Sequence, residues 1–64
     1  MGDFRTLYRG YVVFIFSEFA SWAFRAEPTS PDLPILGNPL QEGHASWGKA
    51  LETAKREIDH LLSG

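Results

Sequence analysis

The segment "SWGKALETAKREIDHLL", residues 46–62, has the most regular pattern in the chain. Its apolar residues recur every three or four positions, the spacing of one side of an α-helix, and they are Trp47, Ala50, Leu51, Ala54, Ile58, Leu61 and Leu62. Charged and polar residues occupy the other side. Ser46 suits the N-cap position, because its hydroxyl can accept a hydrogen bond from a free N–H of the first turn. We therefore predict an amphipathic helix over 46–62 whose apolar side must be covered by another part of the structure.

Two segments upstream have the composition of β-strands. "YRGYVVFIF", residues 8–16, concentrates aromatic and β-branched side chains, which favour a pleated surface. "SWAFRAE", residues 21–27, alternates an apolar set with a more polar one, the period of a half-buried strand. We expect these strands to form a hairpin through the short connection between them, and residues 1–7 to be a loose N-terminus.

All four prolines of the chain lie between residues 28 and 39. Each proline removes a backbone donor and restricts φ, so regular structure should stop in this stretch. A third strand, at an edge of the sheet, can lie between Ile35 and His44. The predicted fold is α+β: one domain over 1–64, with a small antiparallel sheet of two to three strands and a proline-rich connection over 8–45. The C-terminal helix packs on one face of that sheet.

The first predicted strand is apolar on both of its faces, whereas one helix can cover only one of them. Pointing Val12, Phe14 and Phe16 inward leaves Tyr11, Val13 and Ile15 as a predicted protein interface. A slip of one residue would exchange the two sets, so the existence of two apolar faces is independent of this assignment. Because large exposed apolar patches usually mark interfaces, we predict that a second copy or another protein covers the outer face.

Length and composition narrow the classes of protein. A chain of 64 residues buries only about 60% of the surface that its unfolded form exposes, so self-association into a dimer or a dimer of dimers would add needed burial. The absence of cysteine excludes disulfides, thiolate metal sites and a cysteine nucleophile, and it is compatible with the cytoplasmic location that we expect. The net charge of −2 includes no basic stripe, which makes nucleic acid an unfavoured partner. The apolar run over 11–24 contains Glu18 and is too short to span a membrane.

The sequence offers no constellation of catalytic or metal-binding residues. His44 and His60 are the only histidines, and Glu57 with His60 forms an isolated helical pair that lacks further ligands. Ser46 has no histidine and carboxylate in a triad pattern, and helix capping explains it. We therefore predict no enzymatic activity, no catalytic or metal-ligating residue, and no cofactor.

For the two tryptophans and Asp32, a structural role is favoured over a functional one. Trp22 and Trp47 could form a ligand pocket or a platform for stacking bases, but both lie on predicted apolar faces and are expected to pack in the core. Asp32 lies between two prolines, where an Asx turn is more typical than a general acid.

Two motifs support a resemblance to a known family. Pro31, Asp32, Leu33 and Pro34 follow the second predicted strand, and the helix presents Ser46, Trp47, Ala50, Ala54 and Ile58 in a fixed register. In these residues the chain resembles the N-terminal domain of HicB-type antitoxins, a β-β-β-α module with a Pro-Asp-Leu-Pro-Gly segment and a helix of the pattern Thr-hydrophobic-x-Glu-Ala-x-x-x-Ala-x-x-x-Ile. Ile35 and Lys49 depart from that pattern, 35–45 is longer than in the family, and the family's DNA-binding domain has no counterpart in these residues.

The resemblance implies a non-catalytic interaction module that self-associates and binds a protein partner of the HicA-toxin type. Such an antitoxin occludes the active surface of its toxin, so the chemistry belongs to the partner. Two alternatives remain open from the sequence. One is a nucleic-acid-binding module that uses the aromatic residues of the sheet. The other is a stand-alone domain whose ligand site or enzymatic site forms only between subunits.

Overall fold

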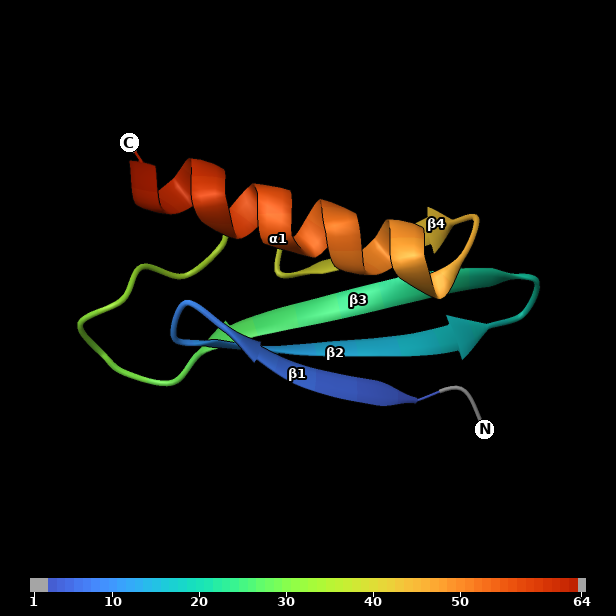
Figure 1. The fold of residues 1–64 in the computed structure, drawn as a ribbon, viewed down its shortest axis with the longest axis horizontal. Coiled ribbons are helices and arrows are strands. Elements are labelled where there is room, and N and C mark those ends of the chain that lie inside the picture. Colours follow the sequence, from blue (N-terminus) through green and yellow to red (C-terminus); the bar gives the residue numbers. More distant parts are fainter. Residues whose placement is uncertain (1–2, 64) are drawn as a thin grey trace.

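The computed structural model describes residues 3–63, which form a four-stranded antiparallel sheet and one helix (Figure 1). The elements are β1 (Phe4–Tyr8), β2 (Tyr11–Glu18), β3 (Ser21–Pro28), β4 (Leu40–His44) and α1 (Trp47–Ser63). The strands lie in the sheet in chain order, and α1 packs across one face. The predicted α+β fold with a single C-terminal helix is confirmed, and the sheet has four strands instead of two or three.

The additional strand comes from a turn inside the segment predicted as one strand. Arg9 and Gly10 have φ angles of 49° and 86°. Positive φ at both central residues is the geometry of a type I′ turn, which matches the twist of the strands on either side of it. The chain therefore reverses at these two residues, and residues 4–8 form β1 instead of a loose N-terminus. Residues 1–2 of that predicted loose segment lie outside the described residues.

Gly10 also has a steric reason to be glycine. A Cβ at this position would lie 2.7 Å from Leu33 Cδ1, in the connection between β3 and β4. Thr29 holds that connection on the turn, because its N–H and its hydroxyl both donate to the carbonyl of Gly10, at 2.9 and 2.8 Å. The start of the proline-rich connection is thus fixed directly to the first hairpin.

The second hairpin, between β2 and β3, confirms the pairing predicted for these two strands. Its two loop residues are Phe19, which has a φ of 58° and a fully exposed side chain, and Ala20. The short loop determines the register, so that Ile15 pairs with Phe24 and Val13 with Ala26. Residues on one face of β2 therefore share that face with the apolar set of β3.

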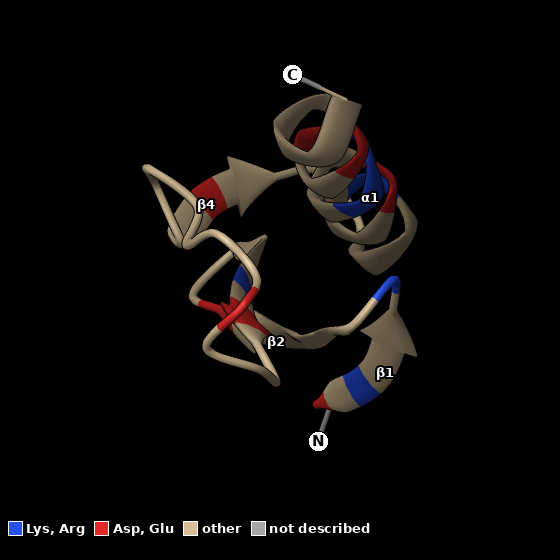
Figure 2. Ribbon diagram, turned by 90° about the vertical axis from the view of Figure 1, so that its left-hand side faces the viewer, with Lys and Arg blue, Asp and Glu red and all other residues tan. Residues whose placement is uncertain are grey.

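The helix begins where the sequence predicts it. The Ser46 hydroxyl accepts a hydrogen bond from the Lys49 N–H at 3.2 Å, and the Ser46 carbonyl accepts one from the Ala50 N–H at 3.0 Å, which confirms the N-cap. Ala50, Ala54 and Ile58 are fully buried against the sheet, as the helical spacing predicts. Figure 2 shows that the sheet curls around α1, with β4 on one side of the helix and β1 on the other.

The predicted edge strand between residues 35 and 44 is β4, which pairs with β3 through an irregular register between Trp22 and Phe24. His44 is the last residue of this strand. The proline-rich connection contributes Leu36, 5% exposed, to the core. The buried Tyr11 hydroxyl donates to the Pro34 carbonyl, so the connection also satisfies a polar group of the core.

Candidate protein-interaction surface

The sheet has a second face, turned away from α1, that no element of residues 3–63 covers. Because side chains alternate along a strand, residues between the buried positions of β2 point to this face. Val12, Phe14 and Phe16 are only partly buried there, although all three are apolar. We use the name open face for the apolar residues on this side of the sheet: Leu7, Val12, Phe14, Phe16, Ala23 and Leu40.

The predicted interface of Tyr11, Val13 and Ile15 is wrong, because all three side chains are 0% exposed beneath α1. The register of β2 with β3 explains the inversion. Phe14 pairs with Arg25, and the residue two positions earlier pairs with Glu27, so this face of β3 carries charges that cannot lie under the helix. Placing the turn at residues 19–20 would have given this register from the sequence.

Charged side chains of both signs border the open face. Arg5, Phe14 and Arg25 form one row across three strands. A hollow of about 460 Å³ lies beside this row, and Asp3, Arg5, Phe14, Phe16 and Arg25 are among the residues that line it. The Arg25 Nε lies 2.6 Å from a carboxylate oxygen of Glu27. By the same alternation Glu18 also lies on this face, so the border carries two positive and three negative side chains.

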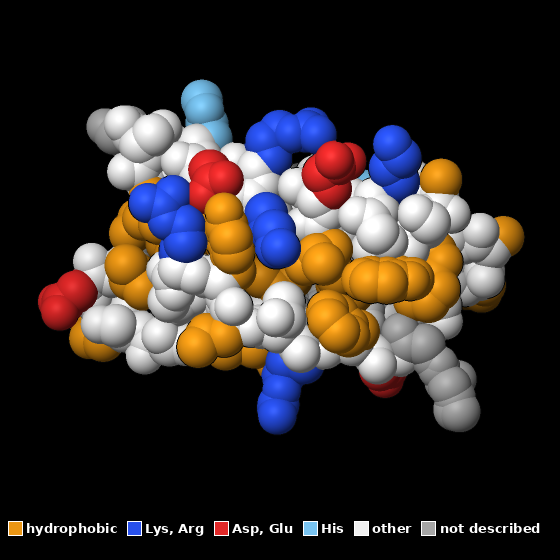
Figure 3. Space-filling model, in the orientation of Figure 1, with side chains coloured by type: hydrophobic (Ala, Val, Ile, Leu, Met, Phe, Trp, Pro, Cys, Tyr) orange, Lys and Arg blue, Asp and Glu red, His pale blue; other side chains and the backbone are white. Residues whose placement is uncertain are grey.

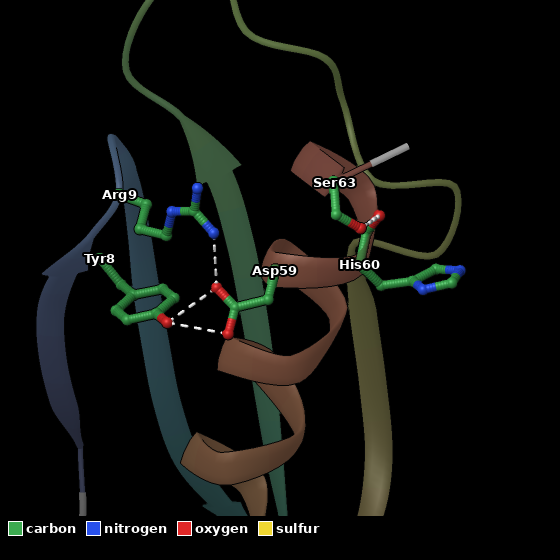
Figure 4. Close-up of polar contacts among 5 residues, drawn as sticks. All are labelled: Tyr8, Arg9, Asp59, His60 and Ser63. Atoms are coloured by element: carbon green, nitrogen blue, oxygen red, sulfur yellow. Dashed lines mark hydrogen bonds and ion pairs between the residues drawn. The ribbon is translucent and has the colours of Figure 1, made fainter.

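A small polar cluster joins the first turn to the helix (Figure 4). The Tyr8 hydroxyl donates to the two carboxylate oxygens of Asp59 at 2.8 and 3.0 Å, and an Arg9 guanidinium N–H donates at 2.8 Å. The hydrogen bond from Arg9, followed by that from Tyr8, lowers the pKa of Asp59, and the bond to Asp59 raises the pKa of Tyr8. The raised pKa keeps the Tyr8 hydroxyl protonated as a donor, and the three side chains together tie the first turn to the helix.

The histidines are not brought into a common site. His60 lies on α1 with its ring directed away from Asp59 (Figure 4), whereas the His44 ring packs against Phe24 with 5.6 Å between centroids. Within residues 3–63, no group of three or more His, Cys, Asp or Glu side chains is arranged to hold a metal ion. His44 Nε2 is buried without a hydrogen-bond partner in this part of the chain.

The two tryptophans and Asp32, for which the sequence favours structural roles, lie in different environments. Trp22 packs at the edge of the core, as predicted, but Trp47 is 48% exposed and packs instead against Phe4, with 5.4 Å between ring centroids. The turn near Asp32 is held by the Ser30 hydroxyl, which accepts the Asp32 N–H at 3.2 Å. The predicted Asx turn is therefore replaced by a serine turn.

Apolar side chains also gather where α1 meets β1. Figure 3 shows a band of them along this junction. Phe4 and Trp47, which are in contact, are 41% and 48% exposed there, and Leu7 is 66% exposed on the opposite side of β1. Exposed aromatic residues are enriched in protein interfaces, so β1 has apolar contact area on both of its sides.

No family model, curated protein or solved structure matches the chain. The resemblance to HicB-type antitoxins therefore stays a prediction from the residues that carry it. In the described part of the chain, α1 is the one helix, and it falls short of the length and apolarity that crossing a bilayer requires.

Proposed function

We propose that this protein is a non-catalytic interaction module that self-associates by burying the open face. The observation that carries the proposal is the partial exposure of Val12, Phe14 and Phe16 on the central strand β2. Removing apolar surface from water is the main favourable contribution to protein association. The single helix covers one apolar face of this sheet, and a second protein surface would cover the other.

The dimensions and charge of the open face favour a second copy as the occupant. With the strand lengths observed, a rise of about 3.4 Å per residue and a strand spacing of about 4.8 Å, the face covers roughly 400 Å². The apolar residues of the open face occupy part of this area, and contiguous apolar patches on the order of a few hundred Å² are often functional. The border carries charges of both signs, so a rotated copy can place Arg25 or Arg5 near an acidic residue. A strongly charged partner would gain little from this border of mixed charge.

The acidic side chains of this border argue against the nucleic-acid alternative. Modules that bind single strands combine aromatic platforms with a positively charged groove. Phe14 and Phe16 could supply the platform, but Asp3 and Glu27 offset Arg5 and Arg25 beside it. An enzymatic or ligand site between subunits finds no support in the polar cluster, in which Tyr8 is held as a protonated donor.

The resemblance to HicB-type antitoxins supports a further protein partner, a toxin of the HicA type whose active surface the module would occlude. A short toxin-like reading frame beside the gene would favour this pairing. Its absence would favour a stand-alone self-associating module.

Sedimentation velocity at low micromolar concentration tests the proposal. The wild-type chain should sediment as an assembly, and Val12→Glu should give a smaller particle, because it places a carboxylate in the buried interface. Ala45→Glu is the matched control, since it adds the same charge at an exposed loop position away from the open face. A folded wild-type monomer contradicts self-association, and an unchanged particle size for Val12→Glu contradicts the use of this face.

A further inference from the structure

The outer edge of β1 carries backbone groups without a partner strand. β1 is the outermost strand, and its Tyr8 pairs with Tyr11 across a two-residue turn. The pair that closes such a turn is a hydrogen-bonded pair, so by alternation Arg5 and Leu7 direct their N–H and C=O groups away from β2. Among residues 3–63, no backbone hydrogen bond outside the regular elements involves these two residues.

The other edge of the sheet is built differently. β4 begins directly after Pro39, contains Gly43 with a φ of 87°, and pairs with β3 through a register shift. Prolines and irregular pairing are devices that protect an edge from adding another strand. β1 has none of these features, because all five of its residues pair regularly with β2 and none is proline or glycine. Of the two edges, β1 is the one suited to receive a strand.

The strand β1 is complementary to itself in one antiparallel register. With a twofold axis at Thr6, the centre of the strand, all five residues are paired, and Phe4 of one copy lies opposite Tyr8 of the other. Aromatic pairs and opposite charges across strands stabilise a sheet, and like charges directly opposite destabilise it.

The two neighbouring registers lack this complementarity. An axis at Arg5 places the two copies of that arginine opposite each other, and an axis at Leu7 leaves Phe4 and Arg5 of each copy beyond the end of the partner's β1. Only the axis at Thr6 therefore avoids arginine opposite arginine while keeping Arg5 and Leu7, with their outward backbone groups, in hydrogen-bonded pairs.

We propose that two copies of this chain pair through β1, antiparallel and with Thr6 opposite Thr6, so that their sheets join into one continuous sheet. This inference rests on the proposed self-association and adds a second interface to it. Two open faces stacked on each other bury roughly 800 Å², below the roughly 1,200 Å² at which stable interfaces begin. Pairing at β1 adds backbone hydrogen bonds and covers part of Phe4, Trp47 and Leu7, whose exposure borders this edge. Two twofold interfaces whose axes intersect at right angles close into a dimer of dimers, which is the assembly that we propose.

Oxidative cross-linking tests the register, because the chain has no cysteine of its own. In the proposed pairing the two Thr6 Cα atoms face each other at about 4.5 Å, within the range of a disulfide, so Thr6→Cys should cross-link nearly completely. Leu7→Cys is the matched control: residue 7 is more exposed, but its two copies are two residues out of register and lie beyond about 7 Å. Cross-linking of Leu7→Cys at an equal or higher rate, or of neither variant, would overturn the pairing.

Particle mass separates this inference from the proposed use of the open face. Arg5→Pro removes an outward N–H, which an edge strand tolerates in the monomer, and Arg5→Ala keeps that N–H while losing the same charge. We expect four chains for the wild type, two for Arg5→Pro or Val12→Glu, and one for the double variant. If Arg5→Pro matches Arg5→Ala while Val12→Glu is monomeric, the β1 pairing is wrong and the open-face proposal stands. If Thr6→Cys cross-links and Val12→Glu leaves the particle mass unchanged, the open-face proposal is wrong and the β1 pairing stands.

Discussion

Neighbouring residues of β2 have opposite environments although their side chains are alike. Val13 is fully buried beneath α1, and Val12 is only partly buried on the open face. Both faces of the strand are apolar, so β2 alone does not determine which one α1 covers. The residues of β3 decide it, because Phe24 and Ala26 share one face while Arg25 and Glu27 share the other. The side of a strand that becomes core is therefore a property of the paired strands.

The largest expected difference in stability is between two single variants, each of which replaces one of these valines with glutamate. Val13→Glu places a carboxylate in a core without a partner, which should cost on the order of 4 kcal/mol or more and leave so small a domain largely unfolded. Val12→Glu should remain folded, because a partly buried carboxylate keeps contact with water, and repulsion from Glu27 opposite it should destabilise the monomer by only about 1 kcal/mol. Urea unfolding followed by circular dichroism at one fixed protein concentration measures both. Equal midpoints for the two variants would refute the assignment of the faces.

A smaller loss of stability should follow from a substitution in α1, the helix that covers the buried face of the sheet. Ala54 is fully buried where α1 meets the sheet. Ala54→Gln overpacks this contact and buries an amide, at a cost of roughly 1 to 3 kcal/mol. Arg56→Gln introduces the same side chain at an exposed position of the same helix and serves as the control. If thermal unfolding of Ala54→Gln coincides with that of Arg56→Gln, the helix does not pack on this side.

The smallest effect concerns the tie between the first turn and the helix, and it depends on pH. Because the pKa of Asp59 is lowered from 3.8, its carboxylate contributes stability above that value, and the contribution is lost as pH falls through the lowered pKa. Because the pKa of Tyr8 is raised from 10.0, its contribution is present below that value and is lost as pH rises through the raised pKa. The cluster is half exposed, so the effect should be small.

Thermal unfolding of the wild type and Asp59→Asn should therefore differ slightly at neutral pH. The two unfolding curves should converge in strong acid, where the carboxylate is protonated in both the folded and the unfolded state. A difference that is the same at both pH values would assign the effect to packing instead of ionisation.

The helix could be predicted closely from the sequence, whereas the first hairpin could not. The helix depends on its own spacing and on Ser46, both of which are local signals. The Arg9–Gly10 turn lacks the asparagine or aspartate that usually marks a type I′ turn, so the run of aromatic and β-branched residues reads as one strand. A glycine inside a strand pattern was the available signal for an interruption at this point.

The existence of an exposed apolar face could be predicted from the sequence, but the residues that form it could not. Two apolar faces follow from the alternation in β2, and the need for a second cover follows from the single helix. Assigning the faces required the register with β3, which depends on the exact position of the turn at Phe19 and Ala20. The free edge of β1 was not predictable once residues 4–8 were interpreted as loose, because a strand must be identified before its edge can be.

The strand order also determines how the chain can fold. Each strand pairs with the one that follows it, and two of the three pairings are closed by two-residue loops. Closing short loops costs little chain entropy, so the hairpins of β1, β2 and β3 can form before the longer connection brings β4 and α1 into place. Substitutions in these hairpins should then slow refolding in stopped-flow experiments, whereas substitutions in α1 should mainly accelerate unfolding. An N-terminal meander that forms early would serve as the template on which the helix docks.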